Sequence, residues 1–232
     1  MEEPELRVGG WEKQGGRKWV KRLFSLSVVI FLGTILLGPN AVDYKPAYVS
    51  SDSVYFPTAW NGPFDIQYSK EFNGHLKISS ISYEASDSKS GKMTVISISS
   101  LIDLSNLNTK AISTQSIVIE KVESQTMLEG LNLKPGTGKI LNTEFIENHG
   151  VYANVYQWDA NVTESSNFFL GNGINSEILV KAYTWTIEKQ SLNFNNGPDI
   201  SQLQSQTIIC IVFGIDNNTI EQATEMIGNV KI

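Results

Sequence analysis

Few residues of this chain have a type and spacing that could support catalysis. The stretch 135–139 reads Pro-Gly-Thr-Gly-Lys and resembles the end of a nucleotide-binding loop. Such a loop needs a glycine at position 133 and a Ser or Thr at position 140, where this chain has Leu133 and Ile140. We therefore interpret 135–139 as a turn that enters a strand.

Nucleophilic catalysis finds no support either. The only imidazoles are His75 and His149, which we expect to be solvated, and no Ser lies in a Gly-x-Ser-x-Gly turn. The single cysteine, Cys210, excludes an internal disulfide, and with two His it excludes a Cys/His zinc site. Because Cys210 stands between two isoleucines, we expect a small buried hydrophobic residue there. The pattern predicts no catalytic residue and no cofactor.

Three carboxylates form the best candidate metal site. Glu144, Glu147 and Asp159 would lie near one another if residues 139–158 form a hairpin, and with Asn148 they could bind Ca²⁺ through oxygen ligands. Their spacing matches no calcium-binding loop. A solvated polar rim is the alternative interpretation.

Aromatic side chains supply a candidate ligand-binding face. They occupy alternate positions of two predicted strands, with Tyr152, Tyr156 and Trp158 on one and Tyr183 and Trp185 on the other. If the strands are neighbours, these rings could bind a ligand or a partner protein. Core packing against a helix is the alternative.

Charge is distributed unevenly along the chain. Residues 1–38 contain six basic and four acidic residues, whereas the remainder contains twelve basic and twenty acidic ones. An acidic domain of this kind repels phosphate backbones, so nucleic acid is excluded as a partner.

The apolar run 23–37 holds fifteen uncharged residues directly after Arg17, Lys18, Lys21 and Arg22. This pattern predicts a single transmembrane signal anchor over 17–38, with residues 1–16 as a disordered cytoplasmic tail and the rest outside. A cleaved signal peptide and a buried core helix are the alternatives. We favour a retained anchor, because Pro39 occupies the position three residues before the best cleavage site.

The exported part divides into a Pro-rich tether over 39–62 and a domain over 63–232. Two sequons begin at Asn161 and Asn217 and would accept glycans in an exported chain. Their number is what chance would give in a chain rich in Asn, Ser and Thr.

Alternating apolar residues predict several antiparallel strands, and two segments predict helices. The first helix runs from a cap at Ser113 or Thr114 to Gly130, and the second follows a capping box of Thr219 and Gln222. The run 207–213 is apolar on both faces, which predicts a central strand. These elements predict an α+β fold, an antiparallel sheet with both helices packed on one face. The other predicted strands cover 65–69, 75–83, 93–101, 139–146, 151–158, 177–187 and 228–232.

The order of these elements resembles that of the PsbP-like domains. The resemblance rests on the aromatic stretch 55–60, the paired strands before 101, the helix around 112–128, the strand 150–156 and the final strand followed by a helix. It covers residues 53–232 and implies an antiparallel sheet between helices and an assembly-accessory role without catalysis.

From these observations we expect a membrane-anchored extracytoplasmic binding or accessory domain. Its partners would be the membrane itself and another membrane or envelope protein. The alternative is a carboxylate- or metal-dependent hydrolase acting on envelope polymers, which would require Glu144, Glu147 and Asp159 to converge in a cleft.

Overall fold

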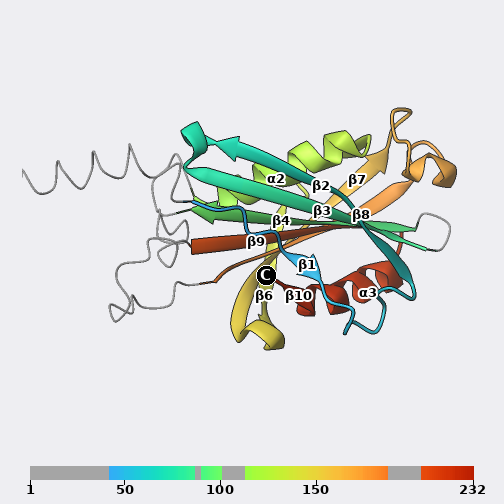
Figure 1. Cartoon of the computed structure of the whole chain (residues 1–232). Helices are drawn as coiled ribbons and strands as arrows, with labels where there is room; N and C mark the ends of the chain where they lie inside the picture. The colour runs from blue at the N-terminus through green and yellow to red at the C-terminus, as the bar shows by residue number, and fades with distance from the viewer. Residues whose placement is uncertain (1–41, 87–89, 101–112, 188–204) are drawn as a thin grey trace, which may run out of the picture.

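The computed structural model describes residues 42–86, 90–100, 113–187 and 205–232. Strands hold 50% of these residues and helices 23%, and most of the strands belong to one antiparallel sheet (Figure 1). The predicted α+β class with both helices on one face is therefore wrong. The described domain is mainly β, and each face of its sheet carries one helix.

The main sheet has eight strands, each paired antiparallel with its neighbours. Both β5 and β6 pair with the same edge of β7. Strand β5 pairs with one end of β7, and β6 pairs with the other end. In spatial order the strands are β2 (Trp60–Glu71), β3 (Leu76–Ala85), β4 (Gly91–Ser100), β9 (Ser205–Gly214), β8 (Glu177–Ile187), β7 (Val151–Val162), β5 (Leu131–Leu133) and β6 (Lys139–Ile146).

Short elements complete the fold. Strands β1 (Tyr48–Val49) and β10 (Val230–Lys231) form a separate antiparallel pair. Single 3₁₀ turns are η1 (Phe72–Gly74), η3 (Glu147–His149) and η4 (Phe169–Asn172).

Helix α2 (Thr114–Leu128) covers one face, here called the α2 face. Its predicted cap is confirmed, because the Ser113 hydroxyl accepts the Ser116 N–H and the Ser116 side chain accepts the Ser113 N–H. The buried side of α2 carries Val118 and Val122, which pack in the cluster that holds Ile96, Ile209 and Trp158, among others.

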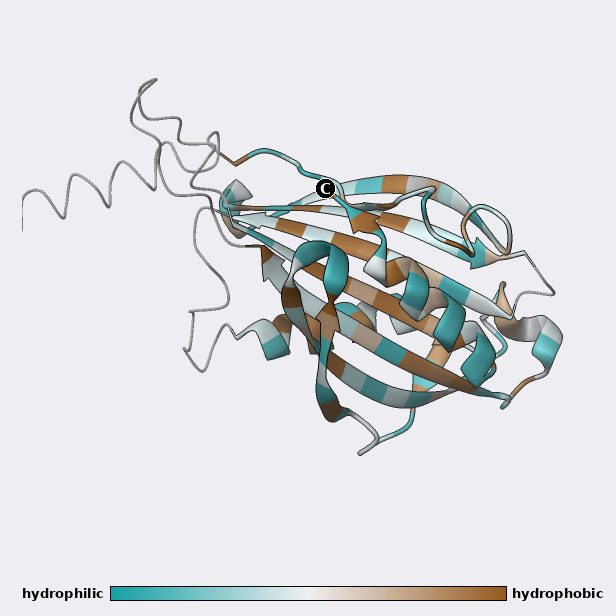
Figure 2. Cartoon of the chain, turned by 90° about the horizontal axis from the view of Figure 1, so that it is seen from below, coloured by the Kyte–Doolittle hydropathy of each residue, from teal (hydrophilic) through white to brown (hydrophobic). Residues whose placement is uncertain are grey.

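Helix α3 (Asn217–Gly228) covers the opposite face, here called the α3 face, with its hydrophilic residues turned outward (Figure 2). The predicted cap at Thr219 is wrong. Asp216 caps the helix instead, since its Oδ1 accepts the Thr219 N–H at 2.7 Å, and the Thr219 side chain is buried. The apolar stripe of Ile220, Ala223 and Ile227 is confirmed as the buried side.

Central strand β9 explains why the sheet needs a helix on each side. The strand lies between β4 and β8, and all ten of its residues are buried. Ile209 faces α2 and Cys210 faces α3, so both faces of the sheet contribute to the apolar core. The prediction of a central strand covered from both sides is confirmed.

The apolar residues of β3 change face part of the way along the strand. Ile78 packs in the core under α2, whereas Ile81 and Tyr83 pack in the core under α3. The register from Leu76 to Glu84 continues against β4 without a bulge. Burial on both faces, without a bulge, therefore accounts for this change of face, and it leaves polar residues on the α2 face of β3.

The sheet has two distinct ends. At one, here called the proximal end, β4 stops at Ser100, β9 begins at Ser205 and β8 stops at Ile187. Nearby, the Ser97 hydroxyl donates to the Lys45 carbonyl at 2.6 Å. The first described residues of the chain therefore reach the sheet at this end (Figure 1). The opposite, distal end contains the end of β3, the start of β4 and the N-terminus of α3.

The stretch predicted as a tether over 39–62 belongs to the folded domain where it is described. Val42 and Ala47 are almost fully buried. Trp60 is also buried, and its Nε1 donates to Gln222 Oε1 on α3 at 3.1 Å. Apolar side chains between the prolines, which composition alone does not distinguish from linker residues, hold this stretch on the α3 face.

The predicted anchor over 17–38 and the tail over 1–16 lie outside the described residues. Among the residues that the structure describes, no helix combines the length and apolar character needed to cross a bilayer.

Candidate functional site

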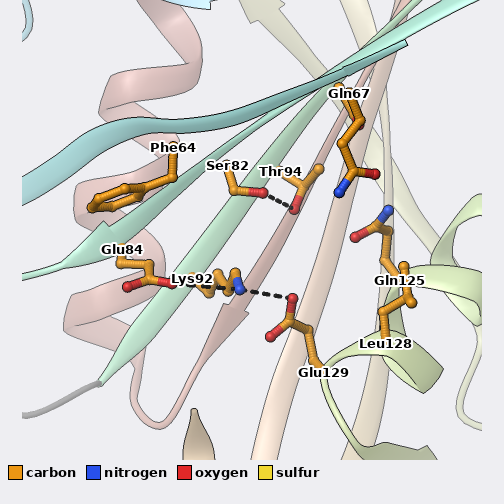
Figure 3. A pocket seen from close by; sticks show the side chains of 10 residues that line it. Phe64, Gln67, Ser82, Glu84, Lys92, Thr94, Gln125, Leu128 and Glu129 are labelled. Carbon is orange, nitrogen blue, oxygen red and sulfur yellow. Dashed lines mark hydrogen bonds and ion pairs between the residues drawn. The ribbon is translucent and has the colours of Figure 1, made fainter. Parts of the chain in front are cut away.

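A polar pocket lies on the α2 face toward the distal end, where β2, β3 and β4 meet the C-terminal end of α2 (Figure 3). Its volume is about 180 Å³, and an adjoining hollow of about 340 Å³ shares the four residues Glu84, Lys92, Leu128 and Glu129. The full lining is Phe64, Gln67, Ser80, Ser82, Glu84, Lys92, Thr94, Gln125, Leu128 and Glu129, with Asn167 and Phe168 in the adjoining hollow.

Lys92 is the charged centre of this pocket. Its Nζ lies 2.9 Å from Glu129 Oε1 and 3.4 Å from Glu84 Oε1. The same ammonium stands 5.6 Å from the centre of the Phe168 ring, close enough for a cation–π interaction. Because only 17% of the Lys92 side chain is exposed, water screens these interactions only partly.

The end of α2 positions Glu129. The Glu129 N–H caps the helix by donating to the Gln125 carbonyl at 3.0 Å. Gly130 follows with a φ of +66°, a left-handed conformation that ends the helix and leads into β5. The C-terminal end of a helix carries a partial negative charge, so the position of the Lys92 ammonium group near this end of α2 is electrostatically favourable.

Neutral hydrogen-bonding groups line the rest of the pocket. Ser82 Oγ and Thr94 Oγ1 lie 3.4 Å apart on neighbouring strands. Among the described residues, the Ser80 hydroxyl and the Gln67 and Gln125 amides have no hydrogen-bond partner. Figure 3 shows the two amides turned toward each other across the pocket. These groups are available to a ligand.

The predicted aromatic residues do not form one face. Tyr156 and Trp158 are buried on the α2 face, their rings stacked with centroids 5.9 Å apart. Tyr183 and Trp185 are buried on the α3 face. β7 and β8 are neighbours as the prediction required, but the register places the two pairs on opposite sides of the sheet.

Tyr152 is the exception, because its side chain is 70% exposed. It contacts Phe145 of β6, with ring centroids 5.1 Å apart.

Burial changes the acidity of the enclosed phenols. It raises the pKa of Tyr183 to about 12; the hydrogen bond between the Tyr183 and Thr224 hydroxyls opposes this change, and the Glu144 carboxylate adds to it. Burial also raises the pKa of Tyr156. Both phenols therefore stay protonated at neutral pH and serve as packing groups.

The three predicted carboxylates do not converge. Glu144 pairs with Ala153 near one end of β7, and Asp159 lies six residues further along that strand, about 20 Å away at ~3.3 Å per residue. Glu147 is exposed in η3. No three His, Cys, Asp or Glu side chains within the described ranges are grouped to hold a metal ion. The three carboxylates named for the hydrolase alternative therefore do not form a common site.

The structure also places the other residues that the sequence singled out. Asn148 donates to the Gly228 carbonyl, and His149 Nε2 lies 2.6 Å from the Val230 carbonyl, so η3 is tied to the end of α3. Cys210 is fully buried, and burial raises the pKa of its thiol. The two sequon asparagines differ in exposure, since Asn161 is half-buried in β7 and Asn217 is exposed at the start of α3.

No motif or spacing in the sequence predicted this pocket. The signal that could have found it is the change of face in β3. After Ile78, the α2 face of β3 continues with Ser80, Ser82 and Glu84, opposite Lys92 and Thr94 of β4. A face that becomes polar at three alternate positions marks the place where the apolar core under α2 ends.

Comparisons with family models, with curated proteins and with solved structures find no match to this chain.

Proposed function

We propose that this chain is a non-catalytic binding or accessory domain, anchored in the membrane by residues 17–38 and lying on the outer side. The observation that carries the proposal is the position of the pocket relative to Lys45, near the point where the described chain begins. The chain comes onto the sheet at the proximal end, beside Ser97, whereas Lys92 and Glu129 lie toward the distal end. An anchor before residue 42 would therefore leave the pocket directed away from the bilayer.

The chemistry of the pocket supports binding rather than catalysis. Its ammonium group is held by two carboxylates, and its other polar groups are hydroxyls and amides, which are weak acids and bases. Such groups orient a ligand through hydrogen bonds. The resemblance of the element order to that of the PsbP-like domains also supports an accessory role.

The topology is tested by labelling introduced cysteines in intact cells with a membrane-impermeant maleimide. Ser165→Cys lies on an exposed distal loop, and Gln14→Cys lies in the N-terminal tail. We expect Ser165→Cys to react in intact cells and Gln14→Cys to react only after permeabilisation. Wild-type protein supplies the background, because Cys210 is buried. The reverse labelling pattern would overturn the proposal.

The binding role is tested by purifying the full-length chain from its native membrane. Gln125→Ala removes a pocket amide, and Gln157→Ala is the matched control on the α3 face of β7. We expect at least one envelope component to co-purify with the wild type and with Gln157→Ala but to be reduced with Gln125→Ala. If the three preparations are identical, the pocket is not the binding site.

A further inference from the structure

We propose that the ligand of this pocket is a neutral, polyhydroxylated molecule, a sugar residue held between Phe64 and the end of α2. This inference rests on the proposed function and specifies its ligand. Three properties of the pocket support it, namely its charge balance, its unpaired polar groups and its apolar wall.

The charge balance disfavours anionic ligands. Lys92 is the one cation among the described lining residues, and the Glu84 and Glu129 carboxylates already flank it. The lining therefore carries one net negative charge. A phosphate or carboxylate entering here would meet this charge without a free cation to balance it.

Cationic ligands are disfavoured for a different reason. The two carboxylates already bind an ammonium group that is part of the same chain, and Lys92 is held near them at a high effective concentration. A ligand ammonium would have to displace Lys92, whose charge would then lose its partners in a site where it is only 17% exposed.

The unpaired groups match the hydrogen-bonding pattern of alcohols. A hydroxyl group of a ligand both donates and accepts, and so do the Ser80 hydroxyl and the Gln67 and Gln125 amides. These three groups come from β2, β3 and α2, and the structure gives them no partner among the described residues. They therefore contact a ligand from two sides, because Gln67 and Ser80 pair across neighbouring strands of the sheet and Gln125 lies on α2. Each can exchange a hydrogen bond with a ring hydroxyl.

Apolar surface at the edge of the pocket completes the match. Phe64 is 41% exposed and Leu128 is 69% exposed, so both present carbon atoms to a ligand. A sugar ring has a C–H face as well as hydroxyl groups, and an aromatic side chain packs against that face. The combination of hydroxyl and amide partners with an aromatic wall fits a carbohydrate better than a wholly polar solute.

The experiment uses the full-length protein in nanodiscs and ligand-observed saturation-transfer NMR. Methyl glycosides of glucose, galactose and mannose are the neutral probes, with choline and inorganic phosphate as charged probes. Trisaccharides of the same sugars separate binding of a polymer end from binding of a free sugar. Variants are Gln67→Ala, Gln125→Ala and Phe64→Leu, and Gln157→Ala is the control.

We expect at least one neutral glycoside to bind the wild type and the Gln157→Ala control. Loss of a pocket amide should weaken that binding about tenfold, the loss expected for one or two hydrogen bonds. Phe64→Leu should weaken it without loss of the fold, because the strand keeps an apolar residue at that position.

Two results would overturn the ligand class. One is the absence of binding by every neutral probe, and the other is binding that the pocket variants leave unchanged. Binding of choline or phosphate that Gln125→Ala abolishes would keep the pocket and replace the ligand. If sugars fail while co-purification from the membrane still depends on Gln125, the proposed function stands and only this inference fails.

Discussion

Lys92 Nζ lies 2.9 Å from Glu129 Oε1, so one ion pair fastens β4 to the residue that follows the last turn of α2. Only 17% of the lysine side chain and 11% of the glutamate side chain are exposed. Both residues line the pocket and its adjoining hollow. Stability and the shape of the candidate site are therefore linked through the same two residues.

We expect Lys92→Met to lower the free energy of unfolding by about 2 kcal/mol, because it leaves two carboxylates close together and partly desolvated. The measurement is urea denaturation of the full-length protein in micelles, followed by tryptophan fluorescence. Lys231→Met is the control, since its ion pair with Asp52 is well exposed at 54% and 67%. An equal decrease in the free energy of unfolding for the two variants would show that the burial of Lys92 does not strengthen its ion pairs.

Gly130 needs both its left-handed backbone and its lack of a side chain. A Cβ at this position would lie 2.3 Å from the Ser166 backbone nitrogen, and φ is +66°. We expect Gly130→Ala to destabilise the fold by about 3 kcal/mol, through strain and overpacking together. Gly136→Ala is the matched control, because φ is +74° there and a Cβ meets nothing within 4 Å. It should cost only the strain, about 1 kcal/mol. Thermal melts of both variants separate the two contributions.

Cys210 should be inert until the chain unfolds. It is fully buried in central strand β9, and burial raises the pKa of its thiol, so little reactive thiolate forms. We expect Ellman's reagent to give no signal with the native protein and one thiol per chain in urea. A rapid reaction under native conditions would contradict the position of Cys210 in the core.

Local patterns were enough to predict most elements of the sheet and both helices. The strand 177–187 and the cap of α2 at Ser113 agree with the structure. These features depend on residues close in the sequence, such as the reciprocal bonds between Ser113 and Ser116. The second cap was misplaced because both Asp216 and Thr219 are good capping residues, and only packing of Thr219 in the core decides between them.

The arrangement of helices and site residues depends on long-range register, which sequence periodicity does not contain. Alternation shows that Tyr156 and Trp158 share a face and that Tyr183 and Trp185 share a face. It does not show that the pairing of Val155 with Tyr183 puts the two sets on opposite sides. The same limitation hid the pocket, since Glu84, Lys92 and Glu129 meet only through the pairing of β3 with β4 and the packing of α2.

Two buried serines of β4 should respond in opposite ways to loss of the hydroxyl. Ser97 Oγ donates to the Lys45 carbonyl and accepts from Gln206 Nε2, both at 2.6 Å. Ser99 Oγ is buried and has no partner among the described residues. We expect Ser97→Ala to cost about 1–2 kcal/mol and Ser99→Ala to be neutral or to stabilise by up to about 1 kcal/mol. Parallel urea titrations of the two variants give the comparison, and a loss at Ser99 as large as that at Ser97 would contradict it.

Stability should fall in alkali partly through Tyr183. Burial raises the pKa of this phenol from 10.0 to about 12, so above pH 10 the unfolded chain releases a proton that the folded chain retains. The unfolded state then binds fewer protons, and the free energy of unfolding decreases as pH rises from 10 to about 12, by about 2–3 kcal/mol for this group. We expect Tyr183→Phe to flatten the decrease, while Tyr152→Phe, at an exposed ring, keeps the wild-type profile. Urea midpoints measured between pH 8 and pH 12 test this, and parallel curves for the Tyr183 variant and the wild type would refute it.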